Sequence, residues 1–426
     1  MGGGLLQLVA YGAQDVYLTG NPQITFFMAV YRRHTNFAIE AVQQTFSGTP
    51  DYGQRVTCII ARNGDLMHRV YLEIDLSNSQ STQYCRFFGL RLIDYIEVEI
   101  GGQKIDKHYS HWLYIWNELS LPKSKKEGYY DMVGAYGGTV SSGSMQKVLY
   151  VPLEFWFCRN IGLALPLISL QYHEVKLNLN FATMDNCKGG DTTTPASGGF
   201  TASLWVDYVF LDTDERKRFA QLSHEYLIEQ LQLGGPETVD KDTNISPKLA
   251  FNHPCKELIW FVTTGNDDKK TTNNNWMNYT NVAMDNTLTK DIYKLENALK
   301  PVTRGASRNH VKSAKLVLNG NDRFSQRNGS YFNLVQPYQH HENIPANAGI
   351  NVYSFALKPE EHQPSGTLNM SRIDSALLKL TMNSTAQGGP ANISYSSTSK
   401  NDLYVYTVNY NVLRIMSGMG GIAYSN

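Results

Sequence analysis

The sequence predicts an all-β protein built from two tandem antiparallel β-sandwiches. Strand-like segments recur in the same order in the two halves of the chain. Aromatic residues make up 12% of the chain, with 26 Tyr and 17 Phe, which favours strands over helices. The segments are short and are joined by connections rich in Gly, Pro and Asn, as in sandwiches and jelly rolls. At 426 residues the chain has room for two domains of about 200 residues each.

The internal repeat consists of three matched segments, each found again roughly 200 residues later. Each match shows alternating apolar residues, the pattern of a strand with one buried face. The pairs are IEVEIGG from Ile96 with AKLVLNG from Ala314, VKLNL from Val175 with LKLTM from Leu378, and LWVDYVFL from Leu204 with LYVYTVNY from Leu403. The collinear order predicts two copies of one β-rich domain whose loops differ in length.

The first residues predict a Gly-rich arm over 1–30 that contains a short helix. Asn21 is a good N-cap, Pro22 suits the first helical position, and apolar residues up to Tyr31 recur at helical spacing. Strands are expected over 37–46 and 55–76. The second run is interrupted by Asn63-Gly64, a dipeptide that favours a hairpin turn.

The rest of the chain follows the same scheme. A strand is expected over 91–105 and a polar loop over 120–146, and further strands are expected near 148–157, 165–181 and 202–211. Asp212 with Glu215 resembles a capping box, so a short exposed helix should join the halves. The predicted organisation is an arm (1–30), a first sandwich (31–212), a helical connector (213–225), a second sandwich (226–413) and a tail (414–426).

The charge and the cysteines exclude several functions. Lys plus Arg equals Asp plus Glu at 38 each, and no long basic stripe occurs, so direct nucleic-acid binding is not expected. Five widely spaced cysteines argue against a disulfide framework and fit a reducing compartment. The sequence predicts neither a secretory signal nor a transmembrane helix.

Catalytic and metal-binding patterns are weak. His108 and His111 lack a third ligand at a recognisable spacing, so packed or surface histidines are the simpler interpretation. Glu97 and Glu99 could bring two carboxylates together on a strand, but the alternating Ile and Val around them indicate a core strand with an acidic side. No enzyme, cofactor or metal is predicted. Among the N-x-[ST] matches, glycosylation is considered at Asn278, Asn383 and Asn392.

Long motifs carry a more specific signal. The stretch QLVAYGAQDVYLTGNPQITFFMAVYRRHTNFAIE from Gln7 closely resembles the N-terminus of major capsid proteins of large icosahedral DNA viruses, especially those infecting algae. VEIGGQKIDKHY from Val98, WVDYVFLDTDERKRFAQLSHEYLIEQLQ from Trp205 and GSYFNLVQPYQ from Gly329 continue the resemblance, which spans the chain. The chain departs from the family chiefly in loops 120–146, 183–200 and 264–310.

The resemblance implies two eight-stranded antiparallel jelly rolls, with short helices in the arm, loops and connector. It implies a homotrimer that forms a pseudo-hexagonal capsomer in the virion shell and contacts neighbouring capsomers, penton and minor capsid proteins. Assembly would occur in the host cytoplasm, outside an inner viral membrane. The alternatives are a tandem carbohydrate-binding sandwich and a minor capsid paralogue.

The arm supplies the candidate contact residues. Aromatic and arginine side chains are common at protein interfaces, and the arm carries Tyr17, Phe26, Phe27, Tyr31, Arg32 and Arg33. We expect these residues to make inter-subunit or base contacts, although Phe27 and Tyr31 could instead seat the short helix on the first sandwich. Loops 120–146, 264–310 and 383–400 are candidates for the outer surface of the capsomer.

Overall fold

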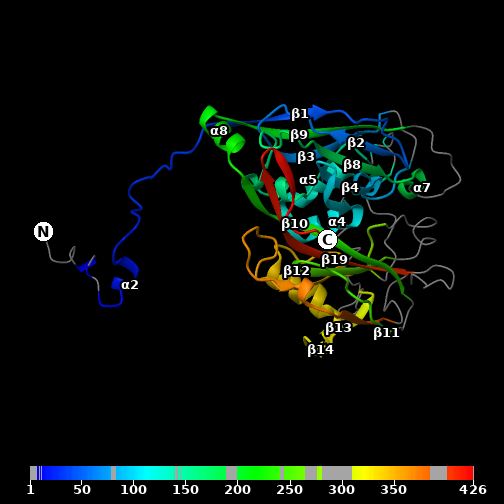
Figure 1. Cartoon of the computed structure of the whole chain (residues 1–426). Helices are drawn as coiled ribbons and strands as arrows, with labels where there is room; N and C mark the ends of the chain where they lie inside the picture. The colour runs from blue at the N-terminus through cyan, green and yellow to red at the C-terminus, as the bar shows by residue number, and fades with distance from the viewer. Residues whose placement is uncertain are drawn as a thin grey trace. The chain divides into compact units, whose positions relative to one another are not determined.

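The computed structural model describes most of the 426 residues. The described residues are 7–8, 10, 12–77, 83–138, 140, 143, 145–188, 199–239, 244–263, 276–280, 309–383 and 401–425. The chain divides into two compact units, Met1–Asn36 and Phe37–Asn426. The second unit, called the body below, contains both predicted sandwiches (Figure 1).

The first sandwich has two antiparallel sheets. Sheet 1a has the order β1-β9-β3-β6, with the short β7 paired to β3, and sheet 1b has the order β2-β8-β4-β5. The strands are β1 (Phe37–Gln44), β2 (Arg55–Ile59), β3 (Leu66–Asp75), β4 (Ile93–Ile100), β5 (Gln103–Tyr109), β6 (Val148–Pro152), β7 (Leu165–Pro166), β8 (Val175–Phe181) and β9 (Thr201–Leu211).

The second sandwich is arranged in the same way. Sheet 2a has the order β10-β19-β12-β16, with β17 on β12 and β20 on β19, and sheet 2b has the order β11-β18-β13-β14, with β15 on β13. The strands are β10 (His224–Val239), β11 (Asn244–Ile245), β12 (Pro254–Thr263), β13 (Val311–Leu318), β14 (Asn321–Asp322), β15 (Arg327–Asn328), β16 (Asn351–Ser354), β17 (Leu368–Asn369), β18 (Ala376–Met382), β19 (Asn401–Met416) and β20 (Met419–Ile422).

The two sandwiches share one topology. With the short strands β7, β15, β17 and β20 set aside, the described residues of each sandwich form eight strands in the order 1-8-3-6 and 2-7-4-5. The three sequence matches fall on equivalent strands: β4 with β13, β8 with β18, and β9 with β19. The predicted duplication and the all-β, double jelly-roll fold are therefore confirmed.

Alternation of side chains explains these strands. In β4, Ile96, Val98 and Ile100 are buried in the first core. In β18, Leu378 and Leu380 alternate with the half-buried Leu377 and the exposed Lys379. A strand places successive side chains on opposite faces, so this period-two pattern fixes which face packs inward.

Helices fill the connections between strands. The body contains α3 (Phe88–Leu92), α4 (Ser110–Ser120), α5 (Lys123–Val133), α6 (Trp156–Arg159), η1 (Ile161–Leu163), α7 (Met184–Cys187), α8 (Thr213–Gln221), the π-helical turn η2 (Tyr331–Val335), α11 (Gln336–His340) and η3 (Met370–Arg372). Helix α8 confirms the predicted connector helix, and the Asp212 side chain accepts a hydrogen bond from the Thr213 amide at its start. Among the described residues, no helix is long and apolar enough to cross a membrane.

The predicted loop 120–146 is wrong in its first half, where α5 forms. The helix buries Tyr129, Tyr130 and Val133. Its lysine-rich sequence hides this apolar face, because Lys126 is itself buried and its Nζ lies 2.8 Å from Glu118 Oε2. Gly134 ends the helix with a left-handed φ of 69°.

The helix predicted after Asn21-Pro22 is also wrong. The arm forms α2 at Val16–Thr19 instead, and residues 21–31 contain turns and extended chain. The apolar side chains expected to line one helical face are exposed, Phe27 at 98% and Tyr31 at 89%. A short helix needs packing on its apolar face, and within this unit these side chains do not have it.

Two further segments differ from expectation. Asn63-Gly64 joins β2 to β3, which lie in different sheets, so the predicted hairpin is wrong. Glycine is needed at position 64 because a Cβ there would lie 2.7 Å from that of Tyr208. Near the C-terminus, β19 continues to Met416 and pairs with β20, so the segment predicted as a tail contains a β-hairpin.

Candidate functional site at the interface of the two sandwiches

The candidate contact residues of the arm are all exposed. Tyr17 lies in α2, Phe26 and Phe27 lie in a turn further along, and the other three follow in irregular chain. Exposed fractions are 93% for Tyr17, 90% for Phe26, 98% for Phe27 and 89% for Tyr31, and Arg32 and Arg33 are exposed as well. The arm therefore presents a run of apolar and basic side chains to its surroundings.

The three candidate glycosylation sites lie in different environments. Asn278 is 1% exposed, and its side-chain oxygen accepts hydrogen bonds from the Thr280 amide and hydroxyl. Asn383 is half-buried, and its side-chain amide donates to the Asn309 carbonyl at 2.7 Å. Asn392 lies outside the described residues. In this fold, burial argues against a glycan at Asn278.

The weak catalytic and metal patterns have structural explanations. Glu97 is buried on sheet 1b, where it pairs with Arg55 at 2.6 Å and Lys104 at 3.2 Å. His108 lies 2.9 Å from Asp106 and stacks on Phe155, with ring centroids 4.3 Å apart. The neighbouring histidine at position 111 points to a different partner, so the two do not converge on one site.

An aromatic layer joins the two sandwiches. His111 and Trp112 on α4 contact the outer face of sheet 2a: the His111 ring lies 5.5 Å from that of Phe261 and 5.7 Å from that of Tyr404, and Trp112 lies 5.7 Å from Tyr406. Phe261 and Tyr406 belong to the same apolar cluster as the first core. Side chains on the inner face of the sheet, such as Trp260 and Val405, form a separate second core. The central strands β12 and β19 of sheet 2a are thus packed on both faces in this region.

A buried ionic cluster lies at the same interface. Glu229 on β10 contacts Arg159 Nη1 at 2.8 Å and Lys256 Nζ at 2.7 Å. Burial raises the pKa of Glu229, but the hydrogen bond from His362 and the charges of Arg159 and Lys256 outweigh it and lower the pKa to about 2. Arg159 comes from the first sandwich and Glu229 and Lys256 come from the second, so the ion pairs tie the sandwiches together.

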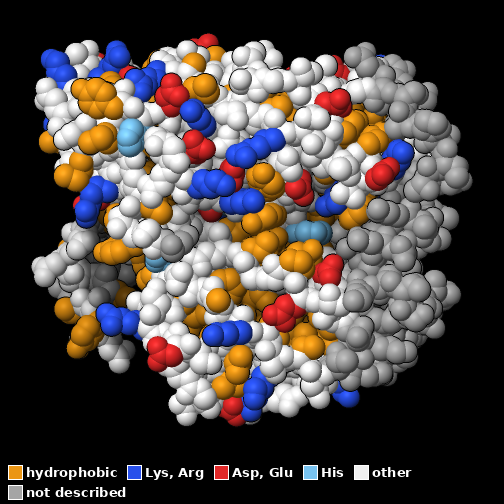
Figure 2. All heavy atoms as spheres, turned by 45° about the vertical axis from the view of Figure 1, so that its right-hand side comes forward, with side chains coloured by type: hydrophobic (Ala, Val, Ile, Leu, Met, Phe, Trp, Pro, Cys, Tyr) orange, Lys and Arg blue, Asp and Glu red, His pale blue; other side chains and the backbone are white. Residues whose placement is uncertain are grey.

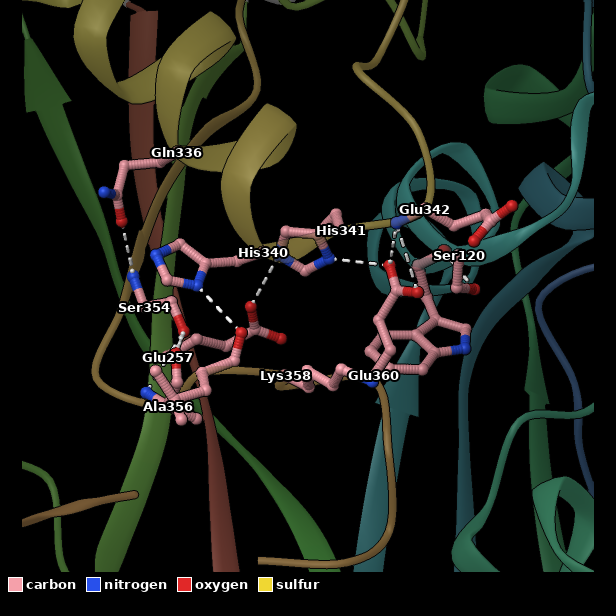
Figure 3. Close-up of polar contacts among 12 residues, drawn as sticks. Ser120, Glu257, Gln336, His340, His341, Glu342, Ser354, Ala356, Lys358 and Glu360 are labelled. Carbon is pink, nitrogen blue, oxygen red and sulfur yellow. Dashed lines mark hydrogen bonds and ion pairs between the residues drawn. The ribbon is translucent and has the colours of Figure 1, made fainter. Parts of the chain in front are cut away.

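A second cluster surrounds His341, directly after α11 (Figure 3). Its Nε2 lies 2.9 Å from Glu257 Oε2 and its Nδ1 lies 2.7 Å from Glu360 Oε1. Burial lowers the pKa of His341, but the two carboxylates outweigh it and raise the pKa to about 9. Two residues further on, Asn343 donates its backbone amide to the Leu119 carbonyl at the end of α4, at 3.0 Å. The loop is therefore fixed to both sandwiches.

Hydrogen bonds between side chains and backbone groups complete the interface. The Leu231 amide of β10 donates to Asp106 Oδ1 at 3.0 Å, and the Gln230 side chain donates to the Ile105 carbonyl. No motif in the sequence indicates these ionic groups as a cluster. One signal was present: Lys256-Glu257 interrupts an otherwise apolar strand, and both residues are buried. Adjacent charges inside a core strand indicate that partners come from elsewhere in the fold.

The outer face of sheet 2a is covered by α4, whereas the outer face of sheet 1a borders a cavity and is called open below. A cavity of about 1230 Å³ lies over it, lined by Tyr71, Tyr150, Trp205 and Asp207 together with α5 residues such as Met132. Tyr71 and Trp205 stack with ring centroids 6.3 Å apart, and Tyr150 meets Tyr71 edge-on at 6.1 Å. This half-exposed aromatic surface distinguishes the first sandwich from the second.

Comparison with known proteins gives the relatives of this fold. Residues 25–212 match the family described as "Major capsid protein N-terminus", and residues 215–421 match "Large eukaryotic DNA virus major capsid protein". The chain is 49% identical to the major capsid protein of Pyramimonas orientalis virus and 45% identical to that of Paramecium bursaria Chlorella virus 1, with both chains fully covered in each case.

Solved structures agree with this relationship. The crystal structure of the capsid protein VP54 of the Chlorella virus PBCV-1 superimposes with a TM-score of 0.77 at 41% identity, covering 94% of this chain and 100% of that one. The Faustovirus major capsid protein, at 13% identity and a TM-score of 0.69, shares the fold. The doubled jelly roll, the match of both halves and the full-length similarity lead to one conclusion: this chain belongs to the family of major capsid proteins of large eukaryotic DNA viruses.

Proposed function

We propose that this capsid protein forms a homotrimer that serves as one pseudo-hexagonal capsomer of an icosahedral shell. The observation that carries the proposal is the identical strand order of the two sandwiches. Three chains with two similar modules each present six similar modules around a threefold axis. Such a block can tile a flat lattice while keeping closed C3 symmetry.

The role that we propose is structural and not catalytic. The partners would be other copies of the chain, neighbouring capsomers, and penton and minor capsid proteins, in a shell assembled in the host cytoplasm close to an inner viral membrane. Figure 2 supports a role without direct genome binding, because Lys and Arg side chains are intermixed with Asp and Glu side chains across the face shown. The formal net charge of zero agrees with this.

The solution mass of the purified protein tests the trimer. Light scattering should give three times the 48.0 kDa of one chain. Negative-stain images of the same fractions should show pseudo-hexagonal particles. A folded protein that remains at the mass of one chain at every accessible concentration would refute the proposed capsomer.

We further propose that the arm binds neighbouring subunits or proteins at the capsomer base. Its support is the exposure of Tyr17, Phe26, Phe27 and Tyr31 beside Arg32 and Arg33. Deleting residues 1–30 should reduce shell assembly far more than it changes the thermal unfolding of the body. A matched control keeps the arm's length and replaces only the four aromatic residues with serine. Normal shells from both variants would contradict this role.

A further inference from the structure

The contact between the two sandwiches of one chain suggests how two copies of the chain could pack on each other. Helix α4 lies between the fifth and sixth strands of the first sandwich, β5 and β6. It covers the outer face of sheet 2a, where Trp112 packs on Tyr406 and His111 on Tyr404. Within the chain, therefore, the helix that follows the fifth strand of the first sandwich covers the outer face of sheet 2a in the second sandwich.

The second sandwich has an equivalent helix whose outer side is not covered by any part of the body that the structure describes. Helices η2 and α11 also lie between the fifth and sixth strands, β14 and β16. Their inner side buries Phe332 and Pro337. An apolar ridge faces outward, with exposed fractions of 48% for Leu334, 39% for Val335, 76% for Tyr338 and 72% for Leu357. Leu334 and Tyr338 are four residues apart and share one helical face.

Likewise, in the described part of the chain the equivalent sheet of the first sandwich lacks a cover like α4, and Trp205 and Asp207 are only half-buried. The matched segments of β9 and β19 place Trp205 at the position of Tyr404 and Asp207 at the position of Tyr406. The second-sandwich residues lie beneath α4, whereas Trp205 and Asp207 line the open cavity over sheet 1a. Among the described residues, the chain thus exposes the η2–α11 helix and the outer face of sheet 1a. Their counterparts in the other sandwich, sheet 2a and α4, pack on each other within the chain.

Charged groups lie beside both surfaces, and Arg327 on one can pair with carboxylates on the other. Arg327, next to the ridge, is exposed and lies over the Tyr331 ring at 4.4 Å. The open sheet carries the carboxylates of Glu73 and Asp207 along the cavity, and the basic residues Arg69, Lys125 and Arg159 line the same cavity. Opposite charges at the rim of an apolar contact favour one pairing and one orientation over others.

We propose that the apolar ridge of one chain packs on the outer face of sheet 1a in a second copy of the chain, with Tyr338 entering the cavity beside Tyr71, Tyr150 and Trp205. This inference rests on the proposed trimer and names the surfaces that build it. The contact is heterologous, because a helix of one copy meets a sheet of the next. Such contacts close into a ring when each step is a threefold rotation. In that ring, all six modules use one mode of packing.

A photo-crosslinker placed at position 338 tests the contact directly. The substituted chain is mixed with isotope-labelled chains that lack the crosslinker, and the linked peptides are identified by mass spectrometry. The expected crosslinks join position 338 of one copy to residues 69–75, 148–152 or 201–211 of the other isotopic form. Crosslinks between copies that map to other surfaces would overturn the proposal.

A charge substitution provides a second readout. Tyr338→Glu places a carboxylate against Glu73 and Asp207 and should abolish the trimer at concentrations where the unsubstituted chain is trimeric. Tyr172→Glu is the matched control, because Tyr172 is 75% exposed and lies outside the ridge; it should leave the trimer intact. Circular dichroism checks that both variants fold. A trimeric Tyr338→Glu variant refutes these surfaces but not the trimer, whereas an unsubstituted chain that never trimerises refutes both.

Discussion

Helices α4 and η2–α11 occupy the same place in two copies of one fold, and their surroundings differ. Residues 112–119 of α4 are all buried, because the first sandwich packs on one side and sheet 2a on the other. The helix of the second sandwich buries one side and exposes apolar residues on the other. Within one chain, the helix of the first sandwich covers a sheet of the second, but the helix of the second sandwich has no third sandwich to cover. The exposed helix and sheet are therefore the surfaces on which the proposed contact between chains depends.

The largest expected difference in stability is between two Trp→Ala substitutions. One removes a tryptophan of α4 beneath sheet 2a, and the other removes a tryptophan on the open outer face of sheet 1a. Trp112 is 1% exposed beneath sheet 2a, and Trp112→Ala should destabilise the chain by about 4 kcal/mol. Trp205→Ala, on the open face, should cost about 1 kcal/mol in the unassembled chain. Urea denaturation of both variants measures the difference. Equal losses would mean that the face of sheet 1a is not open.

The next largest difference in stability is between the loss of a buried ion pair and the loss of an exposed one on the same strand, β10. Glu229→Gln leaves Lys256 and Arg159 without their shared carboxylate and should cost about 3 kcal/mol. Glu225→Gln, the control, removes an exposed pair with Arg414 at 2.7 Å and should cost at most about 1 kcal/mol. Denaturant midpoints at neutral pH compare the two. A small loss for Glu229→Gln would show that the ion pairs do not hold the sandwiches together.

The charge of His341 makes the covered interface sensitive to alkaline pH. In an unfolded chain histidine titrates near pH 6.5, whereas the two carboxylates hold the folded pKa at about 9. The proton is bound more tightly in the folded state, so the stabilisation is complete below about pH 6.5 and is lost as the pH rises towards 9. Denaturation midpoints across this range should fall, and His341→Gln should flatten the curve. If the denaturation midpoint of the His341→Gln variant fell with pH as steeply as that of the unsubstituted chain, other groups would cause the pH dependence.

The smallest effect concerns α5, which borders the open cavity. Gly134 ends the helix at a φ of 69°, and Gly134→Ala should destabilise the chain by about 1 kcal/mol. Gly128→Ala, inside the same helix and with no atom within 4 Å of the new Cβ, should stabilise it by about 0.5 kcal/mol. Thermal melts should move in opposite directions. If the melting temperatures of both variants shifted in the same direction, the left-handed backbone conformation at position 134 would not be what requires glycine there.

Local patterns predicted the strands and the repeat but not the contacts between sandwiches. Period-two alternation at Ile96, Val98 and Ile100 depends on one strand and its core, so it is visible in the sequence. The interface depends on residues far apart in the chain, and Trp205 and Tyr404 look alike as aromatic residues in matching strands. Only the fold shows that one faces a cavity and the other faces a helix. For the same reason the sequence did not predict α5. Lys126 looks like a solvent-exposed residue, but it is buried and paired with Glu118 of α4.

Connector α8 has a consequence for the kinetics of assembly. It links the sandwiches covalently, so the first interface forms within a single molecule, at a high effective concentration that does not fall on dilution. A ring of six unlinked modules would require six molecules to meet, whereas the linked chain requires three. The order of the reaction in protein concentration is halved. The proposed trimer should therefore form at a lower protein concentration than a ring of six separate modules.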